Sequence, residues 1–302
     1  MLIILGILLF SGLSLGTSLP QKMADIAAPF HRACYSFAPH TTEIDQYRAI
    51  VCGTPLGFSS FRDELRQTGL IHLLVVSGSH VAFLETVLVN ASRHFPLIRH
   101  TIPLLLLLFA LVNLLEAVVM RALFSLFLRR VNERFHLSWG EVQILFMAGL
   151  LAMGFCKGKY SLLSLCLSWL LSLALLNLDS PVQPKREPTH AESLIKNARA
   201  YLFVAPGLLP FSLPHPASIL CNFVFAPVMG FALFPASLLA FFIPGFTTVS
   251  DRLWRIVKEV VRFIASYVPP GLERCEIPLT VLLAYVAALS FFAWRKESRR
   301  GW

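Results

Sequence analysis

Two groups of polar side chains interrupt apolar stretches of this sequence, and the larger one lies around a Ser-Gly-Ser sequence. Within the stretch 69–89 its members are His72, Ser77, Gly78, His80 and Glu85. Imidazole, hydroxyl and carboxylate groups are costly to place in hydrocarbon, so we expect them to face an interior cavity or one another. The group predicts either the lining of a pore or gate, or hydrogen bonds that hold a helical bundle together.

The second group consists of Glu116 and Arg121, five positions apart in the apolar run 102–128. An internal salt bridge between them is one interpretation, and Glu85 is another carboxylate that could pair with Arg121. A buried arginine can equally meet a phosphate, because its planar guanidinium donates parallel hydrogen bonds to two oxygens.

Motifs that carry enzyme chemistry are absent from the sequence. There is no HExxH zinc motif and no GxSxG nucleophile elbow, and Gly158-Lys159 lacks the upstream glycine of a phosphate-binding loop. The serines next to His80 do not suggest a catalytic dyad, because neighbouring positions point their side chains apart. We therefore predict no enzyme activity, no cofactor and no metal.

The six cysteines are scattered, and their spacing does not resemble a zinc site. Cys34 and Cys52 lie in the first polar segment, and they could form a disulfide if that segment is outside the cytoplasm. Cys156, Cys166 and Cys221 lie in apolar stretches, where we expect them to pack as small hydrophobic residues.

Composition indicates which elements must carry these groups. Of the 302 residues, 56% are hydrophobic and 14% are charged, against about a quarter charged in soluble domains. Mean hydropathy is +0.68. The sequence predicts an all-α, polytopic bundle of transmembrane helices, with room for about seven or eight spans of roughly 20 residues. The net charge of +9 is explained first by Lys and Arg in loops that orient the helices, and it can also attract a polyanion.

Charge and hydropathy divide the chain into four parts. Residues 1–19 are expected to form an N-terminal membrane anchor, with a cleaved signal peptide as the alternative. The charges of residues 20–68 nearly balance, so this polar segment is placed on the outer side. Residues 69–294 form the transmembrane domain, and the basic tail 295–302 indicates a cytoplasmic C-terminus.

Several apolar stretches of this domain are not simple spans. The run 102–128 is too long for one span, so we expect a span followed by a kinked or re-entrant piece. Repeated prolines between 198 and 243 predict broken half-helices beside protein or a wet cavity. Residues 251–268 form an amphipathic helix that either lies on the membrane surface or packs on the bundle. The stretch 69–89 is interrupted by its polar groups, and Ser77-Gly78-Ser79 could break a helix there. More regular spans are expected at 141–155, 161–178 and 277–294.

The stretch Phe61 to Val81, FRDELRQTGLIHLLVVSGSHV, resembles the signature of the ComEC-type competence membrane domain. Ten positions match: Thr68, Gly69, Leu70, His72, Leu73, Leu74, Ser77, Gly78, His80 and Val81. Weaker matches follow in the family's order. They are Val119–Ala122, the segment around Leu167 and Ser168, and Ser218–Asn222 through to Pro227.

The resemblance implies a channel in the cell (inner) membrane that passes single-stranded DNA during natural transformation. It adds Ser168, Asn222 and Pro227 to the transport-pathway candidates. The partners it implies are single-stranded DNA, membrane lipid, a separate cytoplasmic motor, separate outer-side DNA-binding or nuclease proteins, and further copies of the chain.

Departures from the family pattern leave a second function open. Ala117-Val118 replaces a Pro-Ser pair, and Cys166 replaces a glutamine. The sequence has no room for the outer nucleic-acid-binding domain or the nuclease domain of larger relatives, and it has no HxHxDH motif. A diverged relative that serves as a structural or assembly protein of the membrane, without transport, is the alternative.

Overall fold

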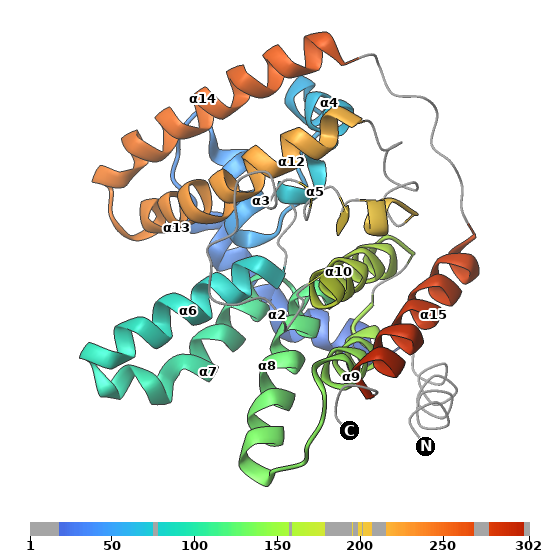
Figure 1. Ribbon diagram of the computed structural model, residues 1–302. Coiled ribbons are helices and arrows are strands. Elements are labelled where there is room, and N and C mark those ends of the chain that lie inside the picture. Colours follow the sequence, from blue (N-terminus) through green and yellow to red (C-terminus); the bar gives the residue numbers. More distant parts are fainter. Residues whose placement is uncertain are drawn as a thin grey trace.

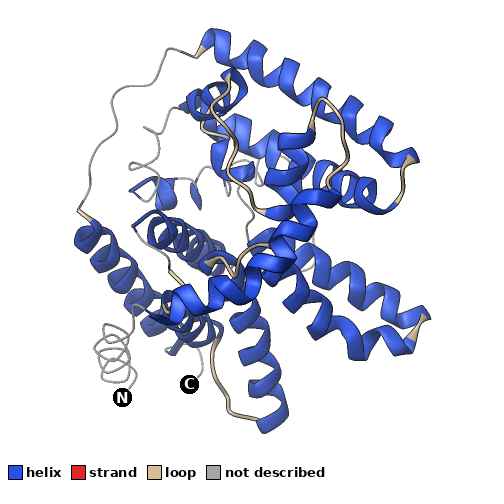
Figure 2. Cartoon of the chain, turned by 180° about the vertical axis from the view of Figure 1, so that it is seen from behind, coloured by secondary structure: helices blue, strands red, loops and turns tan. Residues whose placement is uncertain are grey.

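The computed structural model is a bundle of helices seen from two sides in Figures 1 and 2. It describes residues 18–74, 78–156, 159–178, 195, 199–200, 202–206, 216–268 and 278–298. Within these ranges there is no strand, which confirms the all-α prediction. The positions outside them include most of the predicted anchor 1–19, Ser77 and the end of the basic tail.

The predicted outer segment folds into three helices: α2 (Ser18–Phe37), α3 (Ile44–Cys52) and α4 (Ser60–Gln67). A disulfide joins Cys34 in α2 to Cys52 at the end of α3, with an S–S distance of 1.91 Å. Helix α3 ends at Gly53, which has a left-handed φ of 70°. These helices are not a separate domain, because α2 packs on α7, α3 on α13 and α4 on α14.

The signature region continues into α5 (Ile71–Leu74) and α6 (Gly78–His94), and α6 forms a hairpin with α7 (Pro96–Val112). This hairpin projects to one side of the bundle in Figure 1. Helix α8 (Ala117–Phe135) follows after a sharp break, where Leu114 and Leu115 have φ values of 54° and 53°. The run 102–128 is therefore divided between two helices, as predicted.

Three further helices pack against one another: α9 (Glu141–Met153), α10 (Lys159–Leu178) and α15 (Leu279–Ser298). Helix α10 contacts α8, α9 and α15. Gly149 allows α9 to approach α10 closely, since a Cβ at that glycine would lie 2.5 Å from the ring of Trp169. Both carboxylate oxygens of Glu297 accept backbone N–H groups at the start of α9. The first residues of the predicted tail are thus part of α15.

The proline-rich region differs from the prediction of broken half-helices. Pro227 lies inside α12 (Pro216–Val228), and Pro235 lies in the first turn of α13 (Phe234–Phe242). The two helices are joined by the π-helical turn η1 (Met229–Leu233). A π turn bonds each N–H to a more distant carbonyl, so the stretch accommodates both prolines while remaining helical. Pro210 and Pro214 lie outside the described residues.

Helix α14 (Gly245–Tyr267) is the predicted amphipathic helix, and it begins six residues earlier than expected. Its buried face contains Trp254, Val257 and Val261 and packs on α4 and α13. Packing on the bundle is the alternative that the sequence left open. Val249, Ile256, Phe263 and Tyr267 point outward, so contact with a membrane surface stays a prediction.

Apolar side chains also cover the outside of other helices. Leu104, Phe231, Phe242 and Phe292 are each more than 60% exposed, an arrangement that suits lipid better than water. Among the described helices, Val224–Phe242 is long and apolar enough to cross a membrane, with a mean hydropathy of 2.0. Shorter apolar stretches are Arg99–Val112, Glu141–Met153, Leu162–Leu176 and Thr280–Arg295.

Candidate functional site

Three of the predicted pathway residues meet at one point in the bundle. Gly78 begins α6, Arg121 lies in α8 and Ser168 lies in α10. A Cβ on Gly78 would lie 3.0 Å from Arg121 Nη2 and 3.9 Å from Ser168 Oγ, with the methyl group of Ala122 at 3.6 Å. Residues from three separate stretches of the sequence therefore meet here, and the absence of a side chain at Gly78 lets the Arg121 guanidinium approach α6 closely.

Arg121 is the charged group of this cluster, and it is only 7% exposed. Its Nε is buried without a hydrogen-bond partner. Neither of the two salt bridges considered from the sequence forms within the described residues. Glu85 instead pairs with Arg130 at 3.4 Å, and Glu116 lies at the N-cap of α8. The guanidinium cannot shed its proton at physiological pH, so the site carries a fixed positive charge.

His80 faces the protein interior, as expected for a polar group in an apolar segment. It is 2% exposed, and its ring lies 4.4 Å from that of Phe234 in α13. Phe83, one turn further along α6, contacts Phe234 as well, with ring centroids 5.8 Å apart. His80 thus joins α6 to α13. His72 lies in α5, and its side chain is outside the described set, as is all of Ser77.

The other candidates do not join the cluster at Gly78. Glu85 is seven residues along α6 from Gly78, or about 10 Å at the rise of an α-helix. Asn222 and Pro227 belong to α12, and the side chains nearest to Gly78 come from α8 and α10 instead. Pro227 is exposed and Asn222 is half-buried.

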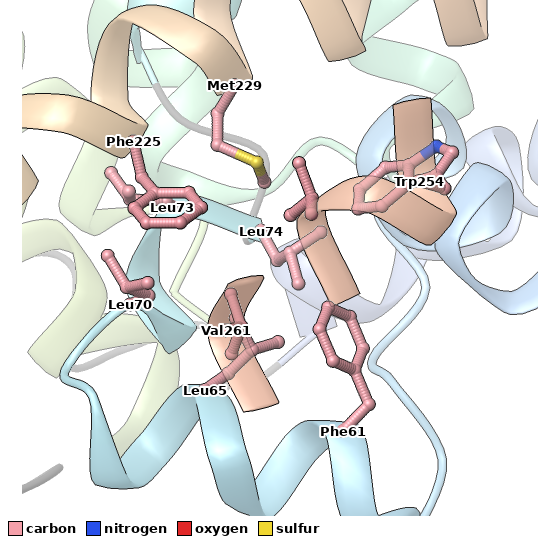
Figure 3. A pocket seen from close by; sticks show the side chains of 10 residues that line it. Phe61, Leu65, Leu70, Leu73, Leu74, Phe225, Met229, Trp254 and Val261 are labelled. Atoms are coloured by element: carbon pink, nitrogen blue, oxygen red, sulfur yellow. The ribbon is translucent and has the colours of Figure 1, made fainter. Parts of the chain in front are cut away.

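A small apolar cavity lies between the signature region and the C-terminal half of the chain (Figure 3). Phe61, Leu65 and Leu74 face Phe225, Met229 and Trp254 across it. Its volume of about 10 Å³ is the least that a single water molecule needs, and its lining has no polar group. It is therefore a packing junction and not a passage for a charged strand.

A network between the outer segment and α14 escaped the sequence reasoning. The buried carboxylate of Glu43 pairs with Lys258 at 2.7 Å, and the Tyr47 hydroxyl donates to Asp251 Oδ1 at 2.8 Å. Burial, together with the nearby Asp251 carboxylate, raises the pKa of Tyr47 well above its usual value. These partners are about 200 residues apart, so no local pattern could reveal them.

Asn113 is a second buried polar residue whose role the sequence did not indicate. Its amide donates to the carbonyls of Val51 and Phe109 at 3.3 Å and 2.8 Å. A Cβ on Gly53 would lie 2.5 Å from its Oδ1. Asn113 thus connects the end of α3 to the end of α7.

Within the described residues, no three His, Cys, Asp or Glu side chains are grouped so that they could hold a metal ion. A family model described as "Competence protein" matches residues 58–299, about four fifths of the chain. No curated protein and no solved structure matches the chain.

Proposed function

The chain belongs to the competence protein family, and from this premise we propose that it is a component of a membrane channel that passes single-stranded DNA into the cytoplasm. Membership supports a role in competence and an association with the membrane. The passage of single-stranded DNA, the channel and the repeated crossing of the membrane are parts of the proposal.

The meeting of Gly78, Arg121 and Ser168 is the observation that carries it. Each lies in a different stretch that resembles the family: the signature, the Val-Met-Arg-Ala segment and the segment around Leu167. The structure brings the three stretches together around one buried guanidinium. A strand of phosphates needs a path with polar and basic lining, and this cluster supplies both kinds of group inside an apolar bundle.

Exposed apolar side chains on several helices support a chain that crosses the inner membrane several times. Helices α4 and α14 lie at one end of the molecule in Figure 1, and the ends of α8 and α15 lie at the other. Basic side chains do not distinguish the two ends, because α4 and α14 together carry at least as many as the ends of α8 and α15. The orientation in this proposal rests on the Cys34–Cys52 disulfide, which suits an oxidising compartment and so assigns α2 and α3 to the outer side.

We assign no catalytic step to this chain. Because the sequence has no phosphate-binding loop, movement of the strand would be driven by a separate cytoplasmic motor. Separate outer-side proteins would bind the DNA and degrade one strand. Membrane lipid surrounds the bundle in this proposal, and further copies of the chain would complete the channel.

Deletion of the gene in a naturally transformable host tests the function. Labelled DNA is expected to remain bound at the cell surface, while its entry into the cytoplasm is lost. A plasmid copy of the wild-type gene should restore entry. Unchanged entry of label in the deletion strain, with no second family member in the genome, would overturn the proposal.

The alternative of a structural or assembly protein without transport has one observation in its favour. Ala117, Val118 and Cys166 stand where relatives have polar groups or proline, and all three are buried. If that alternative holds, deletion should reduce the amount of another membrane protein of the uptake apparatus. Supplying that protein from a plasmid should then restore DNA entry without this chain.

A further inference from the structure

We propose that Arg121, together with Ser168 and beside Gly78, forms a site for one phosphodiester group of the transported strand. The inference rests on the proposed function, since it names the part of the strand that this cluster contacts. The ligand class is a phosphate diester with one negative charge and two free oxygens.

Arg121 is a buried charge without a full set of partners. A buried charge is strongly unfavourable unless it is paired and hydrogen-bonded. Arg121 is 7% exposed, and its Nε is buried without a hydrogen-bond partner. Arginine cannot avoid the cost by losing its proton. An anion that arrives with the substrate would supply the missing partner.

Two carboxylates of the neighbouring helices, Glu85 and Glu141, pair with other arginines of α8. Arg130 pairs with Glu85 at 3.4 Å, and Arg129 pairs with Glu141 at 2.6 Å. Arg121 is thus the arginine of this helix that lies buried among small side chains. It is also the one nearest to the start of α6.

The groups around the guanidinium suit a phosphate. Arg121 Nη2 and Ser168 Oγ both lie within 4 Å of the position that a Cβ on Gly78 would occupy, and their other neighbour there is the methyl group of Ala122. A guanidinium fork and a hydroxyl donor are groups that bind phosphate oxygens, and small side chains beside them leave the donors accessible.

The site lies inside the bundle, because helices α6, α8 and α10 are neighbours and α8 contacts both others. This position favours a phosphate that passes through the protein over the headgroup of a lipid that surrounds it. Both are phosphate diesters, and the experiment has to separate them.

The test measures binding of a fluorescent 20-residue oligothymidylate to the full-length protein in nanodiscs of zwitterionic lipid. We expect Arg121→Met to weaken binding at least tenfold and Arg121→Lys to weaken it less, because lysine keeps the charge but not the fork. Ser168→Ala should weaken binding severalfold. Arg134→Met is the matched control, because it removes an exposed arginine from the same helix, and it should change affinity less than twofold.

The salt dependence of binding distinguishes a phosphate contact from a structural role. Each contact to a single strand contributes about 0.7 to the slope of log affinity against log salt. Arg121→Met should therefore reduce that slope by about 0.7, and an oligonucleotide with uncharged methylphosphonate linkages should bind wild type and Arg121→Met equally. A loss of affinity with an unchanged slope would overturn the proposal.

Remaining outcomes are also decisive. Each variant must keep the Cys34–Cys52 disulfide and elute as a single species, and Arg121→Lys carries the test if Arg121→Met does not fold.

Loss of phosphatidylglycerol binding with unchanged oligonucleotide binding would assign the site to lipid and overturn the proposal. If Arg121→Met binds and imports DNA like wild type, this inference fails while the proposed function stands. If cells that carry the wild-type gene import no DNA, the proposed function fails, whatever the salt dependence of oligonucleotide binding.

Discussion

Glu43 is the clearest case of a single residue that joins distant parts of the chain. Its side chain is 4% exposed, and Lys258 Nζ, 215 positions away, lies 2.7 Å from its Oε2. Removing one partner of such a pair leaves a buried charge without compensation, which costs more than the pair contributes when intact. Lys258 thus anchors α14 to the outer segment.

Lys258→Met is expected to lower the free energy of unfolding by about 1–3 kcal/mol. The loss is smaller than for a fully buried pair, because 24% of the Lys258 side chain stays exposed. Thermal unfolding of the purified protein in detergent measures it. Arg252→Met, an exposed cation on the same helix, is the control and should leave the midpoint nearly unchanged. Equal midpoints for the two variants would mean that the pair does not stabilise the fold.

At the scale of residues, the sequence was most informative where a polar side chain or a glycine interrupts an apolar stretch. Gly78, Arg121 and His80 stand out in apolar runs, and all three lie inside the bundle. The partners of Arg121 could not be predicted, because spacing along a helix indicates which pairs can meet and not which do. Glu43 gave no signal, since its segment has balanced charges of the kind found on a solvated surface.

Among the elements, the end of α3 depends on one backbone conformation. Gly53 has a φ of 70°, and the Asn113 side chain occupies the space where a Cβ would point. A residue other than glycine is less stable in the left-handed conformation. Its Cβ would also displace the Asn113 side chain, which connects the end of α3 to the end of α7.

Gly53→Ala should therefore destabilise the protein by at least about 1–2 kcal/mol, the usual cost of the left-handed region. Gly57→Ala is the matched control, because nothing lies within 4 Å of the Cβ it would add, and it should be neutral. Denaturation midpoints of both variants under non-reducing conditions provide the comparison. A neutral Gly53→Ala would show that the loop can relax around the added methyl group.

The elements predicted most accurately were those marked by a clear sequence pattern, either an amphipathic periodicity or the length of an apolar run. The amphipathic pattern identified α14, and the excessive length of 102–128 identified the break between α7 and α8. Proline was a weaker guide, because its effect depends on whether a neighbouring turn can widen, as η1 does. The three helices of residues 18–67 had no apolar run to mark them.

The whole molecule has two polar ends, and contacts assign elements to each. Arg262 pairs with Glu64, and Gln67 donates to the carbonyl of Ala265, so α14 lies beside α4 and, in the proposed channel, on the same side of the membrane as the outer segment. Glu297 caps α9, and Arg129 pairs with Glu141, so the ends of α8 and α15 lie together, and the proposed channel has them on the other side.

Labelling of single cysteines in intact cells tests this arrangement. Every native cysteine outside the disulfide is first replaced by serine. Phe58→Cys and Arg255→Cys, both at exposed positions, should react with a membrane-impermeant maleimide added outside. Arg134→Cys at the end of α8 should react only after the cells are opened. Protection of Arg255→Cys alongside reaction of Phe58→Cys would contradict the shared side of α14 and the outer segment.

The π turn between α12 and α13 has a consequence for how this chain can change in length. Such a turn holds one residue more than the α-helical turn it replaces, and each residue of an α-helix advances about 100° around the axis. Without the wider turn, one inserted codon would rotate all of α13. Phe234 would then leave His80, and Ser237 would leave Trp254, whose Nε1 now donates to it at 3.0 Å. The turn at 229–233 confines that extra residue to five positions, so we expect that deleting one residue there restores an α-helical turn and keeps α13 in register.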